Sequence, residues 1–157
     1  MRKILVLALF AFAMNGFAQA LENADEMARN VTVEFLKAFK ENNTDAAMKI
    51  SSVPFYVKNA DLFKERADLE KHLREEFQKN AGKLSGLTHE FKDVHSFESI
   101  KDQISEDKEK VFQVLKDGDR VPVVQVKIGD KTMDVAFAVA IRKGKAMVVG
   151  VAKIADR

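Results

Sequence analysis

Apolar side chains recur at helical spacing in the part of the chain that follows residue 20. The stripe advances by three or four residues a turn through Met27, Val31 and Phe35 to the adjacent pair Ala38 and Phe39. Such spacing predicts an amphipathic helix that buries one face. Glu22, Asp25 and Glu26 lie near its expected start, where negative charge favours the helix dipole.

Two further helices and a short hairpin are predicted downstream. Asn43 or Thr44 can cap a short second helix. That helix ends before Pro54, because the residue that precedes a proline avoids the helical region. Aromatic and β-branched residues then favour a short hairpin over residues 54–64. The third helix is expected over 66–81, where apolar side chains repeat every fourth residue: Leu69, Leu73 and Phe77.

The period changes from helical to two after Gly86, which predicts a strand over residues 88–99. The odd positions form its aromatic face: His89, Phe91, Asp93, His95 and Phe97. The even positions form a mostly polar face. Residues 105–116 return to a helical pattern. Three more alternating segments follow, around 124–128, 133–141 and 146–154.

The order of these elements defines the fold class. Consecutive strands joined by glycine turns indicate an antiparallel sheet. Helices gathered early and strands gathered late indicate an α+β fold rather than an α/β fold. Because residues 21–157 contain no repeat, low-complexity tract or linker, we expect them to form a single domain.

Residues 1–20 have the pattern of a cleavable signal peptide. Arg2 and Lys3 precede an apolar run, and Ala18-Gln19-Ala20 supplies the small residues that a signal peptidase requires. The alternative is a membrane anchor, which needs roughly 20 apolar residues; Asn15 interrupts the run before that length. We therefore expect cleavage after Ala20, export to the periplasm or the medium, and no membrane contact by the mature protein.

Removal of the signal peptide leaves a balanced charge. The whole chain has 26 Lys and Arg and 24 Asp and Glu. The signal peptide holds two of the basic residues and no acid, so 24 of each sign remain. A balanced chain lacks the electrostatic footprint of a nucleic-acid-binding protein and that of a polybasic membrane-surface domain. The absence of cysteine excludes disulfides, thiolate metal sites and cysteine nucleophiles.

Three features of the chain together resemble the nuclear transport factor two-like (NTF2-like) superfamily. They are the opening helix over 31–39, the run Asn43-Thr44-Asp45-Ala46-Ala47 that leads to Val53-Pro54-Phe55, and the closing hairpin over 135–154. The superfamily includes SnoaL-like cyclases and ketosteroid isomerases. The resemblance implies a cystatin-like cone, in which a curved sheet wraps around the helices, a pocket at the open end, and frequent dimers. Family enzymes place a carboxylate, a tyrosine or a His–Asp pair in the cone, and no such set matches here.

The last two strands are apolar on both faces. In the first of them, small residues at 136, 138 and 140 alternate with larger ones: Val135, Phe137, Val139 and Ile141. In the second, Met147, Val149 and Val151 alternate with Val148, Gly150 and Ala152. A solvated face would be polar. The small-residue face therefore predicts a homodimer or, alternatively, cover by the chain's own helix near Val111.

Three polar side chains are candidates for a ligand pocket: Tyr56, Asp93 and His95. Polar groups on an apolar strand face are costly unless they are paired, and a histidine can exchange a proton near neutral pH. The alternatives are a solvated strand end or a bulge that turns Asp93 and His95 outward. Tyr56 is equally well explained as an amphipathic core residue.

The histidines do not form a recognisable metal site. His89 and His95 are six residues apart, which is about 20 Å along a straight strand. His72 precedes Glu75 and Glu76 on the expected third helix, but an ordinary solvated helix face has the same spacing. Serine-nucleophile, phosphate-loop and dinucleotide motifs are absent from the sequence. We therefore expect no metal and no cofactor.

Two functions of different class remain. The first is an exported binding or accessory domain with an apolar, cone-shaped pocket for a small molecule or a protein partner, without catalysis. The alternative is a SnoaL-like cyclase, isomerase or dehydratase that uses Asp, His and Tyr as acid–base groups. A purely structural dimerisation module is a third possibility. The absence of a recognisable catalytic dyad favours binding.

Overall fold

The computed structural model describes the backbone of residues 3–60 and 62–156, and the side chains of residues 22–60 and 62–154. In chain order its elements are α1 (Lys3–Lys40), α2 (Thr44–Lys49), β1 (Ser51–Val57), β2 (Leu62–Phe63), α3 (Arg66–Asn80), η1 (Ala81–Lys83), β3 (Thr88–Ser96), α4 (Phe97–Ile100), η2 (Lys101–Gln103), α5 (Lys108–Val114), β4 (Arg120–Ile128), β5 (Lys131–Arg142) and β6 (Lys145–Asp156). This order confirms the α+β class.

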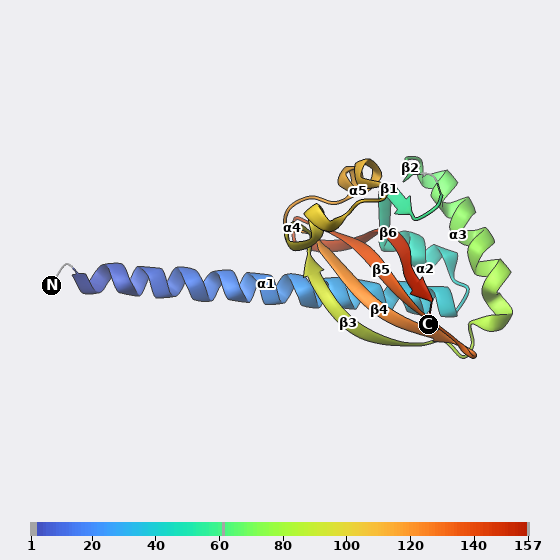
Figure 1. The fold of residues 1–157 in the computed structure, drawn as a ribbon, viewed down its shortest axis with the longest axis horizontal. Helices are drawn as coiled ribbons and strands as arrows, with labels where there is room; N and C mark the ends of the chain where they lie inside the picture. The colour runs from blue at the N-terminus through green and yellow to red at the C-terminus, as the bar shows by residue number, and fades with distance from the viewer. Residues whose placement is uncertain (1–2, 61, 157) are drawn as a thin grey trace.

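The described strands form one six-stranded sheet in the order β2-β1-β6-β5-β4-β3. β1 runs parallel to β6, and the other neighbours are antiparallel. The sheet curves along α1, and α3 lies beyond its β1–β2 edge (Figure 1). Two predicted turns close the last hairpins, at Gly129 and Gly144, where φ is +59° and +73°. Glycine adopts such positive φ values without steric cost.

α1 begins much earlier than expected: the helix starts at Lys3, whereas the sequence pattern placed its start near Glu22. The acidic residues therefore lie in its middle. Its first part projects away from the body of the protein (Figure 1). Among the described α1 side chains, those of the core begin with Ala28. The side chains of the expected signal peptide lie outside the described residues, and cleavage after Ala20 stays a prediction.

Helix caps and stripes otherwise follow the sequence pattern. The side chain of Asn43 accepts a hydrogen bond from the backbone N–H of Ala46 over 3.0 Å and so caps α2. Leu69, Leu73 and Phe77 of α3 are all buried. Within the part of the chain that the structure describes, no helix has the length and apolar character needed to cross a membrane.

The main core lies between the helices and the inner face of the sheet. Phe35 of α1 is at its centre, with ring centroids 6.5 Å from Phe55, 6.3 Å from Phe77 and 6.0 Å from Phe137. Aromatic pairs at these separations stabilise a core beyond the area that they bury. Helix α1 is thereby fixed against β1, α3 and β5 at one point.

A register shift between Phe91 and Asp93 corrects the predicted face of β3. The extra residue of a bulge reverses the alternation of side chains beyond it. Phe91 and Val94 therefore both pack against the main core, whereas the pattern placed Phe91 with Asp93 and His95. The strand also ends at Ser96, and Phe97 begins α4.

A second shift corrects the predicted faces of β6. Ala138 pairs with Gly150, and the next residue of β5 pairs with Val148, so Val149 is the extra residue. Val148 and Val151 pack with the main core, while Val149 and Ala152 pack on the outer face. The simple alternation expected from the sequence was therefore wrong at this bulge.

Residues 97–115, which we call the strap, cross the outer face of the sheet. The strap contains α4, η2 and α5, the last of which corresponds to the predicted helix over 105–116. Val111 and Leu115 pack with Ala138 and Ala140 in a second apolar cluster. The chain itself thus covers part of the small-residue face, as the alternative expectation held. Dimerisation through this face stays a prediction.

Candidate functional site

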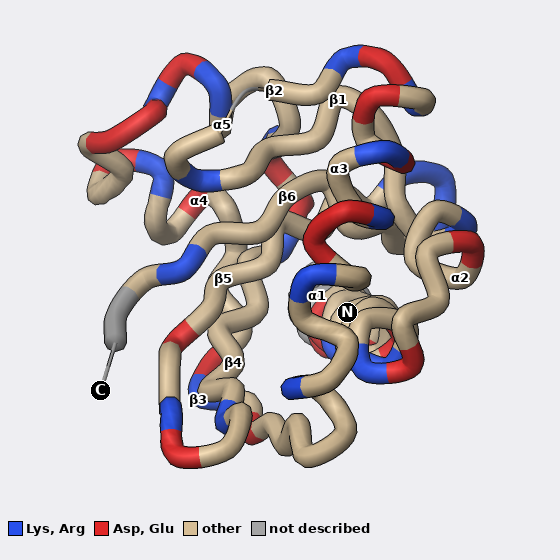
Figure 2. The backbone as a smooth tube through the Cα atoms, turned by 90° about the vertical axis from the view of Figure 1, so that its right-hand side faces the viewer, with Lys and Arg blue, Asp and Glu red and all other residues tan. Residues whose placement is uncertain are grey.

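The first candidate site is a cavity of about 420 Å³ inside the cone, which we call the cone cavity. Its lining comes from α1, α3 and the inner face of the sheet. Helix α1 lies across the sheet from α5 (Figure 2). Its deep wall is the phenylalanine cluster around Phe35. Half-buried apolar residues surround its open end: Phe39, Val57, Ile128, Met133 and Val151. This volume falls within the range of about 300–1,000 Å³ that is typical of small-molecule sites.

Three polar side chains stand at the mouth of the cone cavity: His72, Glu76 and Lys153. His72 and Glu76 are four residues apart on α3 and therefore share one face of that helix. The His72 ring stacks on Phe63 with a centroid separation of 4.7 Å. These three mouth residues were not predicted from the sequence, although His72 and Glu76 each lie next to an apolar residue of the α3 stripe.

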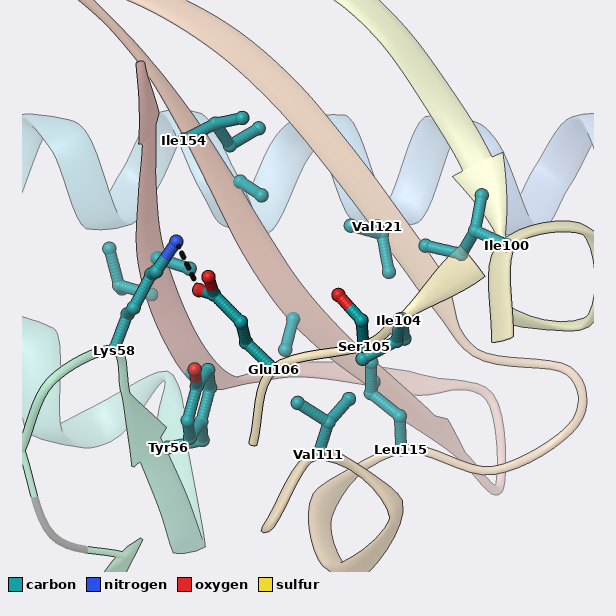
Figure 3. Close-up of a pocket in the computed structure, with 15 residues that line it drawn as sticks. Tyr56, Lys58, Ile100, Ile104, Ser105, Glu106, Val111, Leu115, Val121 and Ile154 are labelled. Atoms are coloured by element: carbon teal, nitrogen blue, oxygen red, sulfur yellow. Dashed lines mark ion pairs between the residues drawn. The ribbon is translucent and has the colours of Figure 1, made fainter. Parts of the chain in front are cut away.

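The second candidate site lies across the sheet, between its outer face and the strap (Figure 3). This outer cavity has a volume of about 410 Å³. Its floor consists of small residues of β5 and β6: Ala136, Ala138, Gly150 and Ala152. Apolar strap residues form the wall above that floor: Ile100, Ile104, Val111 and Leu115. The space therefore exists because the floor side chains are small.

Tyr56 lies at the outer cavity and not in the cone. Strand alternation places Phe55 in the main core and Tyr56 on the outer face. The Tyr56 phenol donates a hydrogen bond to Oδ2 of Asp107 over 3.1 Å. Burial, together with this hydrogen bond and the negative charge of Asp107, raises the pKa of Tyr56 to about 12. The phenol is therefore protonated at neutral pH and acts as a hydrogen-bond donor.

Two charged side chains meet at the rim of the outer cavity. Nζ of Lys58 lies 3.0 Å from a carboxylate oxygen of Glu106 (Figure 3). The Lys58 side chain is 30% exposed and the Glu106 side chain is 73% exposed. Lys58, Ser105 and Glu106 were not predicted from the sequence, because the fold alone brings the strap residues Ser105 and Glu106 to Lys58.

Asp93 and His95 form a pair that lines neither cavity. Nδ1 of His95 lies 3.6 Å from Oδ2 of Asp93, and their side chains are 38% and 62% exposed. The structure thus brings Asp93 and His95 together but does not bring either of them to Tyr56. Their role in ligand binding stays a prediction.

The described residues contain no group of three or more His, Cys, Asp or Glu side chains that could hold a metal ion. His72 with Glu75 and Glu76 is accordingly not such a group. The arrangement of polar groups around both cavities suits hydrogen bonding and charge pairing at a rim, with apolar contact inside.

Two solved structures have a similar fold. One is an NTF2-like protein of unknown function from Silicibacter pomeroyi, with a TM-score of 0.50, 10% sequence identity, and coverage of 82% of this chain and 92% of that chain. The other is a domain of unknown function with a cystatin-like fold from Nostoc punctiforme, with a TM-score of 0.50, 13% identity, and coverage of 83% and 76%. No family model and no curated protein matches the sequence.

The chain therefore has the NTF2-like, cystatin-like α+β fold, which confirms the fold that the resemblance implied. Because one fold can carry many functions, this similarity assigns no ligand or reaction. The function has to be inferred from the cavities themselves.

Proposed function

We propose that the protein is an exported, non-catalytic domain that binds a small apolar molecule in the cone cavity. The observation that carries this proposal is the cavity of about 420 Å³, apolar along its walls and polar only at its mouth. Sites of this kind obtain affinity from apolar contact and orientation from a few polar groups.

The geometry of the mouth supports binding rather than catalysis. An acid–base enzyme needs at least two ionisable groups that converge on the reacting atoms in a cavity that excludes water. Glu76 is 44% exposed and its carboxylate pairs with Lys79 over 3.6 Å. Tyr56, the candidate phenol, lies on the other face of the sheet. His72 is then the mouth residue that can orient a polar group of the ligand.

Export is supported by the position of α1. The core side chains described on this helix begin with Ala28, so cleavage after Ala20 leaves them in place. N-terminal sequencing of the protein after secretion from a bacterial host tests this part of the proposal. We expect the mature chain to begin at Leu21, and a retained Met1 would contradict it.

Binding in the cone is tested with Nile red, a neutral apolar dye whose fluorescence rises in an apolar site. The informative variant is Val57→Phe, because Val57 is half-buried in the wall of the cavity. The matched control is Val33→Phe, since Val33 is 39% exposed on α1. We expect Val57→Phe to weaken dye binding at least about tenfold, which corresponds to about 1.4 kcal/mol, and Val33→Phe to leave it unchanged.

Urea unfolding of both variants shows whether each is folded under the conditions of the dye titration. Equal dye affinity in a folded Val57→Phe protein and in the wild type would contradict the proposed site. Mass spectrometry of the protein purified from its own host, under native conditions, then identifies any molecule that is retained.

A further inference from the structure

The outer cavity (Figure 3) is a second site, lined from the face of the sheet opposite that of the cone cavity. It belongs to the second apolar cluster, whereas the cone belongs to the main core. Val151 contributes to both linings, and therefore cannot be used to distinguish them. The proposed function of the cone makes no use of this site.

Close packing around Gly150 excludes a larger side chain at this point of the floor of the outer cavity. A Cβ atom at Gly150 would lie 2.8 Å from the backbone oxygen of Tyr56 and 3.2 Å from Cβ of Ala138. A side chain at this position therefore has no room without movement of the sheet. An empty apolar cavity lowers the stability of a folded protein. An apolar molecule that fills the space above the small floor residues therefore restores part of that stability.

The rim supplies one cation that can change partners. Lys58 is the less exposed member of the Lys58–Glu106 pair, and Glu106 reaches it from the strap with a largely exposed side chain (Figure 3). A pair with one exposed member contributes little stability, so Glu106 can leave at small cost. A buried ligand would shield Lys58 further from water. Because an unpaired charge is costly to bury, Lys58 would then be stabilised by a negatively charged group on the ligand.

Two charged residues next to this rim, Asp107 and Lys110, already have partners. Asp107 accepts the hydrogen bond from Tyr56, and Nζ of Lys110 lies 3.6 Å from Oδ1 of Asp107. Lys110 also donates to the backbone oxygen of Ala60 over 3.3 Å. An incoming carboxylate can thus replace Glu106 on Lys58 without disturbing these contacts. An incoming amine would instead face the positive charge of Lys58.

We propose that the outer cavity binds an apolar molecule that carries a carboxylate. The apolar part lies on the floor of Ala136, Ala138 and Ala152, beneath the strap, and the carboxylate takes the place of Glu106 on Nζ of Lys58. The ligand class is an amphiphilic carboxylate, such as a medium-chain fatty acid.

The test measures calorimetric binding of decanoate and of decanol, its neutral counterpart, to the mature chain. We expect the wild type to bind decanoate about tenfold more tightly than decanol, the size of one charge-assisted contact. Lys58→Met removes this preference. Glu106→Gln increases decanoate affinity, because the competing carboxylate is gone. Equal affinities for the two probes in the wild type, or a preference that survives Lys58→Met, would overturn the proposal.

Cavity-filling variants locate the binding. Ala152→Phe occupies the outer cavity, and Ala67→Phe places the same side chain on an exposed position of α3. We expect decanoate binding to be lost in Ala152→Phe and kept in Ala67→Phe and in Val57→Phe. Loss in Val57→Phe alone would overturn this inference and leave the cone proposal intact. Unchanged Nile red binding in Val57→Phe, with decanoate binding lost only in Ala152→Phe, would overturn the cone proposal and leave this inference intact.

Discussion

The phenol of Tyr56 and the carboxylate of Asp107 form a hydrogen bond of 3.1 Å that fastens the strap to the sheet. Asp107 immediately precedes α5, and its backbone oxygen accepts from the N–H groups of Lys110 and Val111. One residue thus joins the start of a helix to strand β1. Burial of Tyr56 and its hydrogen bond to Asp107 both raise the pKa of the phenol, so a titration of Tyr56 reports on this contact.

The ionisation of Tyr56 is expected at an unusually high pH. The chain has one tyrosine and no tryptophan, so the ultraviolet absorbance of tyrosinate reports on Tyr56 alone. We expect a midpoint of about 12 in the folded protein, read after a rapid pH jump, against about 10 for the chain unfolded in urea. Asp107→Asn should lower the folded midpoint partway, because burial remains.

The same shift makes stability depend on pH. The folded pKa lies above the unfolded one, so the folded state holds the proton more tightly. The contribution of Tyr56 is therefore complete below pH about 10 and is lost as the pH rises towards about 12. A Tyr56→Phe variant should lack this part of the alkaline loss. An identical alkaline profile in both proteins would contradict the assignment.

Asp119, which follows the strap, is expected to be more sensitive to substitution than its exposed neighbour Asp117. It is fully buried and accepts from the backbone N–H groups of Lys116 and Ile141 over 2.8 and 2.9 Å. It also binds the guanidinium of Arg142 and raises the pKa of that group. Asp119→Ala should lower the free energy of unfolding by about 3 kcal/mol, since it leaves buried donors without a partner.

Asp117→Ala is the matched control for this substitution, measured by urea unfolding. Asp117 pairs with Lys101 over 3.3 Å, but its side chain is 69% exposed. Its removal should change the free energy of unfolding by less than about 1 kcal/mol. If both variants lost a similar amount of unfolding free energy, the burial of Asp119 would not explain the effect of Asp119→Ala.

Gly150→Ala tests the close approach of β6 to β1. The added Cβ would meet the backbone oxygen of Tyr56 at 2.8 Å, and backbone cannot move aside as a side chain can. We expect a loss of about 1–3 kcal/mol in thermal or urea unfolding, the usual cost of overpacking. Gly82→Ala, with no atom within 4 Å of the added Cβ, should be neutral or stabilising by up to about 1 kcal/mol.

Asp25 should stabilise the docking of α1 on the sheet. Its Oδ1 lies 2.6 Å from Nε of Arg120, whose side chain is 3% exposed while that of Asp25 is 43% exposed. Asp25→Ala should cost about 1–2 kcal/mol, less than the loss of one partner from a fully buried pair. Glu22→Ala, an exposed change on the same helix, should cost less than about 0.5 kcal/mol. Equal effects would contradict a specific role for the Arg120 contact.

Much of the fold could be predicted from the sequence, because its signals are local. The apolar stripe of α1, the Asn43 cap and the glycine turns at 129 and 144 each act within a few residues. They determine where helices and strands form and in which order. That order was sufficient to predict an α+β fold, and the resemblance to the NTF2-like superfamily implied the cone; the similar solved structures have this fold.

The faces of the strands and the composition of the sites were decided only by the tertiary structure. A bulge before Asp93 turns that residue away from the face of Phe91, and another at Val149 exchanges the faces of β6. Whether a strand accommodates an extra residue depends on its neighbours in the sheet, not on its own alternation. Tyr56 likewise meets Asp107 across 51 positions of chain, a distance over which no periodic pattern carries information.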